Sequence, residues 1–298
     1  MQRFQRIAIP EGGSPLVTHT DRFQRYSVQP IVVYRDNADS EAELVRRIGD
    51  ADCVLIGWGS KLSRETIRAC RGLSYIGLAA TLFTGPGSNI DLEAAQERGI
   101  AVSGVSDYGD IGVVEFVLCE IIRHIKYGDE NTELGSHRVG IVGAGATGSR
   151  VAEAIHNLGA ATYYFSRTRK PDLDGLGIRS MPLIELLHTA DIVSLHLPRN
   201  TRLLYEPEMR AFTGHRLLIN TSLGLPVERS AMERWLQDPT NRFVADADGA
   251  VGIRDVAEHR GNVFLYEHYA GFTTEAQGRL VDKVERNIER FLHDTRSA

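Results

Sequence analysis

The chain has 298 residues, of which 42% are hydrophobic and 24% charged. This composition is typical of a globular protein with two domains of ordinary size or one large one. The formal net charge of −5 gives no reason to expect nucleic acid or an anionic membrane surface as a partner. No apolar run approaches the roughly 18 residues of a membrane span, and the first residues lack the apolar core of a signal peptide.

The N-terminal part of the chain alternates between strand-like and helix-like patterns. Such alternation predicts a parallel α/β sheet with helices on both faces. A long apolar helix follows at residues 113–125, and we expect the first domain to end at residue 104. The predicted strands are residues 6–10, 30–34, 53–57, 75–79 and 99–103, and the predicted helices are residues 42–48, 63–70 and 92–98.

The three cysteines, Cys53, Cys70 and Cys119, are widely spaced and lie mostly in apolar context. An odd, scattered set of this kind predicts neither a disulfide framework nor a metal site. We expect buried, free thiols in a reducing compartment, and therefore a cytoplasmic protein without a bound metal.

The segment from Val139 to Ser149 is the most informative in the chain. A short apolar run ends in the pattern Gly143-x-Gly145-x-x-Gly148, and a helix-like pattern begins at once. A dinucleotide site needs strand, tight turn and helix in this order, because the glycines allow the turn, the approach of a pyrophosphate and close helix–strand packing. The N–H groups and the positive dipole end of the helix would face the phosphates. The sequence therefore predicts a Rossmann-type site.

The next predicted strand, residues 161–165, ends where the adenosine ribose is usually met. An NAD site usually has Asp or Glu there, whereas this chain has Ser166-Arg167-Thr168-Arg169-Lys170. A guanidinium can hold a 2′-phosphate through paired, charge-assisted hydrogen bonds, and a carboxylate would repel it. Arg167 is the leading candidate, so we favour NADP(H) over NAD(H). A solvated basic loop is the alternative.

The pattern of strands and helices then continues to the end of the chain. It predicts a second α/β domain over residues 105–271, whereas the last helix is expected to return to the first domain, which comprises residues 1–104 and 272–298. The strands are residues 192–197, 216–220, 243–246 and 263–266, and the helices are residues 182–188, Glu206–Ala211, 229–236 and Thr274–Asp294.

Six stretches occur in the order and at the approximate spacings of one known family. They are Asn89-Ile90-Asp91-Leu92, Val114-Glu115-Phe116, the glycine pattern, Leu195-His196-Leu197-Pro198, Ile219-Asn220-Thr221 and His268-Tyr269-Ala270-Gly271. On these motifs the chain resembles, over nearly its full length, the D-2-hydroxyacid dehydrogenase family, including its NADPH-using glyoxylate and hydroxypyruvate reductases. The resemblance implies a homodimer of α/β fold, with two Rossmann- and flavodoxin-like domains, parallel sheets and an interdomain cleft that holds the active site.

The resemblance also implies which residues contact the cofactor. They lie in the glycine turn, in the loop after the second strand and at the ends of later strands, and Asp246 matches the contact to the nicotinamide carboxamide. The set is Gly143, Gly145, Ala146, Thr147, Gly148, Ser166, Arg167, Thr168, Arg169, His196, Leu197, Pro198, Thr221, Ser222 and Asp246.

The family's proton donor, a histidine, matches His268. In the family a carbonyl takes a hydride from the nicotinamide while this histidine supplies the proton. A protonated imidazole near neutral pH suits that role, and a structural histidine at a strand end is the alternative. The family's substrate-binding arginine falls at Leu223, which offers no donor, so a carboxylate buried there would be unpaired. Arg202 and Arg229 are the alternative cations.

The acidic residue that keeps the family's histidine basic falls at Val251. Asp248 and Asp255 are the alternatives in a rearranged loop. Glu267 is a poor partner for His268, because adjacent side chains on a strand point to opposite faces. Without a carboxylate, His268 has less support for its protonated form.

A loop at residues 80–87 is expected to bind the substrate. The resemblance implies that the backbone N–H groups of Leu82 and Phe83 meet the substrate carboxylate, and that Tyr108 and Leu223 line the same cleft. An ordinary interdomain loop is the alternative.

Together these residues predict an NAD(P)H-dependent oxidoreductase. It would transfer a hydride to the carbonyl, or a related C=N group, of a small molecule in a specialised biosynthetic pathway. The rival hypothesis is a dinucleotide-binding protein that has lost catalysis and serves as a sensor or interaction partner. His268 favours the first, whereas Leu223 and Val251 favour the second.

Overall fold

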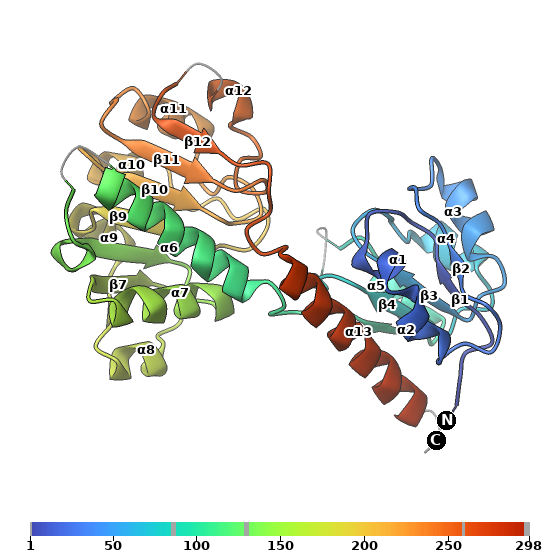
Figure 1. Ribbon diagram of the computed structural model, residues 1–298. Helices are drawn as coiled ribbons and strands as arrows, with labels where there is room; N and C mark the ends of the chain where they lie inside the picture. Colours follow the sequence, from blue (N-terminus) through green and yellow to red (C-terminus); the bar gives the residue numbers. More distant parts are fainter. Residues whose placement is uncertain (1, 85–87, 128–130, 258–259, 295–298) are drawn as a thin grey trace. The chain divides into compact units, whose positions relative to one another are not determined.

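The computed structural model of the chain has two compact units, and each unit contains one parallel β-sheet (Figure 1). The structure describes residues 2–84, 88–127, 131–257 and 260–294. Unit 1 comprises Met1–Tyr108 and Thr274–Ala298, and unit 2 comprises Gly109–Thr273. The predicted α/β class with parallel sheets is confirmed.

Unit 1 contains a five-stranded parallel sheet in the order β2-β1-β3-β4-β5, which is the strand order of flavodoxin-like folds. Helices α3, α4 and α5 pack on one face, and α1, α2 and α13 pack on the other. The strands are β1 (Ile7–Ile9), β2 (Val32–Val33), β3 (Cys53–Ile56), β4 (Tyr75–Leu78) and β5 (Ala101–Ser103). The helices are α1 (Pro15–Thr18), α2 (Thr20–Gln24), α3 (Glu41–Ile48), α4 (Arg64–Ala69), α5 (Leu92–Glu97) and α13 (Thr274–Asp294).

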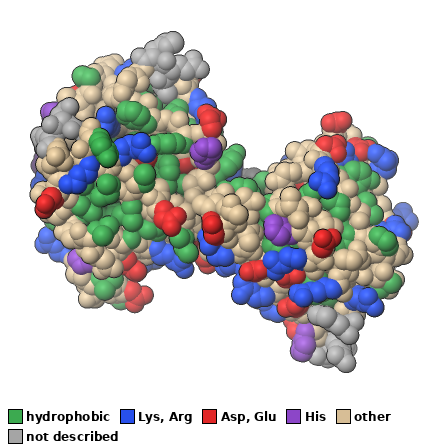
Figure 2. All heavy atoms as spheres, viewed as in Figure 1, with side chains coloured by type: hydrophobic (Ala, Val, Ile, Leu, Met, Phe, Trp, Pro, Cys, Tyr) green, Lys and Arg blue, Asp and Glu red, His purple; other side chains and the backbone are tan. Residues whose placement is uncertain are grey.

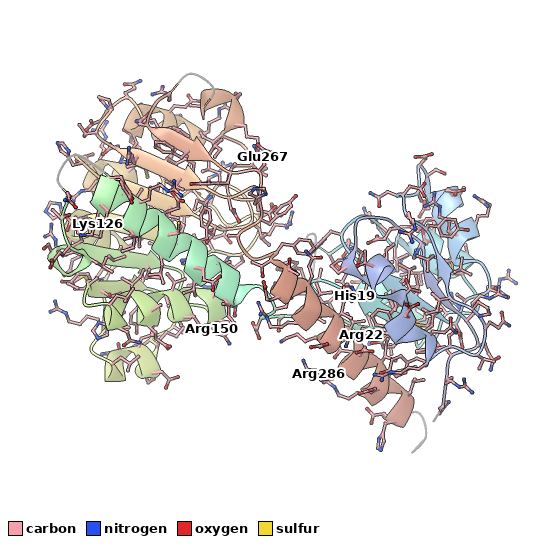
Figure 3. All side chains as sticks on the ribbon, viewed as in Figure 1. His19, Arg22, Lys126, Arg150, Glu267 and Arg286 are labelled. Atoms are coloured by element: carbon pink, nitrogen blue, oxygen red, sulfur yellow. The ribbon has the colours of Figure 1, made fainter. Side chains whose placement is uncertain are left out.

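The last helix, α13, supplies a large share of one core of unit 1. Its apolar residues recur at helical spacing, so that they form one face. That face packs against β1, β3 and β4, and Arg22 of α2 donates a hydrogen bond to Asp282 of α13 at 2.6 Å (Figure 3). The buried apolar residues of α13 are Leu280, Val281, Val284, Ile288 and Leu292.

Unit 2 contains a seven-stranded parallel sheet in the order β12-β11-β10-β9-β6-β7-β8, which extends the strand order of Rossmann folds by one strand. The strands are β6 (Arg138–Val142), β7 (Ala161–Phe165), β8 (Arg179–Ser180), β9 (Ile192–Leu195), β10 (Leu217–Asn220), β11 (Arg242–Ala245) and β12 (Val263–Leu265). The α-helices are α6 (Asp110–Tyr127), α7 (Ala146–Asn157), α8 (Pro171–Gly175), α9 (Leu183–Thr189), α10 (Glu206–Ala211), α11 (Arg229–Trp235) and α12 (Arg254–Ala257).

The strands of unit 2 are buried on both faces. Along β9, Ile192 packs with α6, α7 and α8, whereas the next residue, Val193, packs with α9, α10 and α11. Such alternation follows from the two-residue period of a strand. Because every pair of neighbouring strands is parallel, their carboxyl ends share one edge of the sheet. The chain order reverses between β6 and β9, and ligands of open α/β sheets bind at such a point.

The structure differs from the sequence prediction in its shortest elements. Helices α1, α2, α8 and α12 and strand β8 were not expected, and β2 is only Val32–Val33 instead of residues 30–34. Elements of two to five residues contain too few apolar positions to show a period. Tertiary contacts decide their conformation.

The cysteine prediction is correct in part. Cys53 and Cys70 are buried and free, but Cys119 is exposed on α6, because the apolar pattern of a helix with a mixed outer face does not reveal which side faces the core. Among the described residues, no group of His, Cys, Asp and Glu could hold a metal ion, and no helix is long and apolar enough to cross a membrane.

Candidate active site

The glycine turn between β6 and α7 is built by close backbone contacts. Gly143 has φ of 98°, a conformation that glycine adopts without strain. A Cβ on Gly143 would overlap the carbonyl oxygen of His196, and a Cβ on Gly148 would overlap the carbonyl oxygen of Gly143. Beside Gly145, by contrast, nothing lies within 4 Å of an added Cβ. Two glycines thus allow the packing, and the third leaves open space next to an exposed backbone.

The first turn of α7 is suited to bind an anion. Gly145 is its N-cap, and no side chain caps the helix. The free N–H groups at such a terminus, together with the helix dipole, attract phosphate. The open space at Gly145 and the uncapped N–H groups therefore fit the diphosphate of a dinucleotide.

Thr147 connects this turn to α6. Its hydroxyl donates to Oδ1 of Asp110 at 2.6 Å, and Nε of Arg150 lies 3.7 Å from Oδ2 of the same carboxylate. Arg150 lies on α7 (Figure 3). Asp110 is buried at the start of α6, and the sequence analysis did not single it out. Thr147 therefore has a structural partner, and its backbone N–H is the group that remains for a ligand.

The loop after β7 presents basic side chains and no carboxylate at residues 166–170. Arg169 forms an ion pair with Asp174 at 2.6 Å, and the N–H of Lys170 donates to the hydroxyl of Tyr164 at 2.8 Å. Arg167 is exposed and has no hydrogen-bond or ion-pair partner within the described ranges. Of the guanidinium groups in this loop, that of Arg167 is the one available to a ligand.

The loop after β9 is tied to the loop after β10. In His196, Nε2 lies 2.9 Å from Oγ of Ser194 and Nδ1 lies 3.1 Å from Oγ1 of Thr221. Burial lowers the pKa of His196 to about 4, so this imidazole is neutral at pH 7. The N–H of Leu197 donates to Oγ of Ser222 at 2.9 Å. The hydroxyl groups of this motif therefore hold the two loops together, while Pro198 is exposed.

Two buried polar side chains fix the next loops. The amide of Asn220 donates to the carbonyl oxygens of Gly224 and Gly249, at 3.0 and 2.9 Å. The carboxylate of Asp246 accepts hydrogen bonds from the N–H groups of Gly249 and Ala270, both at 2.9 Å, and burial raises its pKa. Asp246 thus joins the β11 loop to the segment that carries His268.

His268 follows β12 on an ordered backbone. Its carbonyl oxygen accepts from the N–H of Ala247 at 2.9 Å. Its side chain is exposed and has no hydrogen-bond partner in the part of the chain that the structure describes. The neighbouring Glu267 (Figure 3) forms an ion pair with Arg254 at 2.8 Å, so it does not assist the imidazole.

The positions expected to assist His268 hold no suitable group. Leu223 is half-buried in the loop after β10, and Val251 is exposed on a turn. Arg229 and Asp255, both considered as substitutes, form an ion pair with each other. Arg202 is exposed. Asp248 is the remaining carboxylate, and burial raises its pKa, an effect that the charge of Arg199 opposes.

The expected substrate loop lies in unit 1, after β4. The N–H groups of Leu82 and Phe83 donate no hydrogen bond to any described residue, so they are available to an anion. The end of this loop, residues 85–87, lies outside the described residues. The ring of Phe83 lies 5.8 Å from that of Trp58, a residue that the sequence analysis missed. Tyr108 packs against the core of unit 1.

Unit 2 thus has the strand order, the glycine turn and the uncapped helix of a Rossmann dinucleotide-binding domain. Residues 123–247 match the family model described as D-isomer specific 2-hydroxyacid dehydrogenase, NAD binding domain. The chain is 25% identical over 290 residues to the hydroxypyruvate reductase of Blautia hydrogenotrophica, covering 88% of each chain. It is 26% identical over 321 residues to the glyoxylate reductase of Thermococcus litoralis, covering 95% of this chain and 91% of the relative.

Solved structures share the fold. The apo-structure of D-lactate dehydrogenase from Escherichia coli has a TM-score of 0.80 at 19% identity and covers 96% of both chains. An acyclic imino acid reductase, Bsp5, in complex with NADPH and D-Arg has a TM-score of 0.77 at 22% identity and covers 97% of both chains. The chain is thus similar, in its residues 123–247, to the NAD-binding domain of D-isomer specific 2-hydroxyacid dehydrogenases, and over most of its length to hydroxypyruvate and glyoxylate reductases.

The two kinds of glycine in the turn predict different effects. Gly148→Ala should weaken both folding, by about 1–3 kcal/mol because the turn is overpacked, and cofactor binding. Gly145→Ala should leave stability nearly unchanged but weaken cofactor binding, because its methyl group would enter the open space. Thermal unfolding and fluorescence titration with NADPH measure the two effects.

Gly278→Ala, in α13, is the matched control, because nothing lies within 4 Å of its added Cβ and alanine favours a helix. It should lower neither quantity. Normal NADPH affinity in Gly145→Ala would contradict the placement of the diphosphate.

Proposed function

We propose that the chain is an NADPH-dependent reductase of the D-2-hydroxyacid dehydrogenase type, with an altered active site. It reduces the carbonyl, or a related C=N group, of a small molecule. The observation that carries the proposal is that His268 stands at the family's proton-donor position, in the same unit as a glycine turn suited to a dinucleotide.

The residues of unit 2 divide into cofactor holders and a proton donor. The first turn of α7 holds the diphosphate, and the guanidinium of Arg167 holds a 2′-phosphate. When bound, NADPH supplies the hydride. His268 gives a proton to the oxygen or nitrogen of the reduced bond, as a general acid. In unit 1, the N–H groups of Leu82 and Phe83 receive the substrate carboxylate. These roles are supported by the fact that none of these groups has a hydrogen-bond or ion-pair partner among the described residues.

The preference for NADPH rests on the charge of the loop after β7. A carboxylate there would accept from a ribose 2′-hydroxyl and repel a 2′-phosphate. This loop has Arg167 instead, which meets no carboxylate among the described residues, so that it would bind a dianionic group through charge-assisted hydrogen bonds.

The substrate is not a standard small 2-oxo acid. Leu223 stands where the family has an arginine, and Arg229 is held by Asp255 and Glu233. Removing a charged hydrogen bond to a substrate typically costs about 1.5–3 kcal/mol. We therefore propose a specialised substrate, and the shared fold of an imino acid reductase supports including C=N groups.

The alternative is a dinucleotide-binding sensor without catalysis. It is favoured by His268 having no carboxylate partner among the described residues, because such a partner would stabilise an imidazolium. Turnover of any carbonyl or imine substrate separates the two proposals.

We propose a homodimer formed by unit 2, in a cytoplasmic enzyme. A groove of about 660 Å³ lies beside α6, β11 and β12, and its lining is mostly apolar. Its rim includes Tyr127, Ile122 and Phe264, which are exposed. Figure 2 shows hydrophobic side chains gathered on this face of unit 2. Exposed apolar patches of this kind mark protein interfaces.

The cofactor preference predicts the effect of a charge reversal. Arg167→Asp should weaken NADPH binding by about 10- to 100-fold, the value of hydrogen bonds to a charged group, and should make NADH the tighter ligand. Titration of the purified protein with both cofactors measures this. Arg169→Gln is the control, because Arg169 is held by Asp174, and it should change the preference less. Equal affinities for NADPH and NADH in the unaltered protein would contradict the assignment of NADPH as the preferred cofactor.

The absence of a donor at Leu223 predicts which substrates the protein reduces. Glyoxylate, pyruvate and hydroxypyruvate should be reduced very slowly with NADPH, whereas Leu223→Arg should raise kcat/KM for them by about tenfold or more, because it adds a donor for the carboxylate. Steady-state assays with Leu223→Met as the packing control test this. Efficient reduction by the unaltered protein would show that another cation has replaced the arginine.

The assignment of His268 as the proton donor predicts a loss of turnover when this residue is replaced. His268→Ala should lose about 10²- to 10⁴-fold in kcat, the usual contribution of general acid catalysis, while NADPH affinity barely changes. The assay uses the best substrate of a 2-oxo acid panel, with His293→Ala, an exposed histidine on α13, as control. Full activity in His268→Ala would assign the proton to another group.

A further inference from the structure

Trp58 is an exposed aromatic residue at the carboxyl edge of the unit 1 sheet. It follows β3 in the segment Gly57-Trp58-Gly59, and 42% of its surface is exposed. The chain has two tryptophans, and the other, Trp235, is buried in unit 2 with its indole N–H donating to a backbone carbonyl.

The loop that carries Trp58 is held in place on both sides. The buried carboxylate of Glu11 accepts a hydrogen bond from the N–H of Gly57. The amide of Asn89 donates to the carbonyl oxygens of Gly57 and Ser60, both at 2.9 Å. The carboxylate is fully buried and burial raises its pKa. A loop fixed by buried polar groups presents its exposed side chain in one place.

Gly57, which precedes Trp58, is required by the same packing. A Cβ on Gly57 would lie 2.8 Å from Oε1 of the buried Glu11, which is shorter than real Cβ contacts. The chain next to Trp58 therefore has room for no side chain at position 57.

Trp58 lies beside the proposed carboxylate site. Strands β3 and β4 are neighbours and parallel, so the loops that follow them meet at one edge of the sheet. Phe83 connects the two features, because its N–H is free and its ring packs on Trp58 with centroids 5.8 Å apart. Two aromatic rings and two free backbone donors thus share one edge of unit 1.

We infer that Trp58 and Phe83 form a subsite for a ring-bearing side chain of the substrate, which is a 2-oxo acid with an aromatic or bulky apolar group, or its imine. This inference rests on the proposed function. In the reaction the hydride adds to C2, the carbonyl oxygen takes a proton and NADPH becomes NADP⁺. A small acid has no group to bury against the rings, whereas a ring-bearing acid gains contact area that offsets the missing arginine.

The first test compares phenylpyruvate with pyruvate in steady-state assays of the full chain with NADPH. Phenylpyruvate should have at least a tenfold higher kcat/KM, since apolar burial discriminates by about 10- to 200-fold. Trp58→Ala should lower the ratio of the two kcat/KM values about tenfold, whereas Trp58→Phe should retain most of it. Tyr205→Ala, an equally exposed aromatic residue in unit 2, should not change the ratio.

The second test measures binding without turnover. D-phenyllactate should change the tryptophan fluorescence at lower concentration than D-lactate does, because Trp58 is accessible and Trp235 is buried. In Trp58→Phe the signal should vanish while calorimetry still detects binding, and in Trp58→Ala binding should weaken about tenfold. Thermal unfolding of each variant checks that the fold is intact.

The outcomes separate the subsite from the proposed function. If binding of D-phenyllactate depends on Trp58 but no 2-oxo acid is turned over, the result supports the subsite and contradicts the proposed reductase activity. If small acids are turned over as fast as phenylpyruvate or faster, the result contradicts the subsite and is consistent with the reductase activity. A ratio unchanged in Trp58→Ala, or lost stability as its sole effect, overturns the subsite too.

Discussion

The contact between the backbones of Gly148, Gly143 and His196 is the constraint on which unit 2 depends. It brings the first turn of α7 against β6 and against the neighbouring β9 at the point where the strand order reverses. Because no Cβ fits between these backbones, the helix terminus with its free N–H groups lies directly at the edge of the sheet. The polar residues that follow the other strands lie along the same edge of the sheet, because all neighbouring strands are parallel.

Around that turn, the polar side chains of the motifs form hydrogen bonds within the protein. Ser222, Thr221 and Asn220 bond to the neighbouring loops, and Asp246 uses both carboxylate oxygens to hold backbone N–H groups. Buried polar groups that are fully bonded make a loop rigid. The exposed groups, Arg167 and His268, stand on this rigid edge with no partner among the described residues. The division between fixed and free side chains is what makes the edge a candidate site.

Much of this arrangement could be predicted from the sequence. The apolar run that ends at Val142 and the pattern at residues 192–197 predicted strands, and the structure has β6 and β9 there. The glycine pattern predicted the turn, since Gly143 and Gly148 each have a steric cause, and Gly145 leaves open space beside the backbone. The short helix α8 and strand β8 lack a period, so that nothing in the sequence marked them. The ion pair between Arg229 and Asp255 was not foreseen either, because the two residues are distant in sequence. Trp58 was missed for a related reason: a single aromatic residue gives no spacing to interpret.

The placement of α13 has a consequence for how the chain folds. Unit 2 is continuous in sequence, so each of its strands meets its neighbours within one uninterrupted segment. Unit 1 is split, and the faces of β1, β3 and β4 that carry Ile7, Leu55 and Tyr75 receive their cover from Leu280, Val284 and Ile288. During synthesis on the ribosome, α13 is made last, so this part of the apolar face lacks its cover until all of unit 2 has been made. Exposed apolar surface of this kind is prone to aggregation.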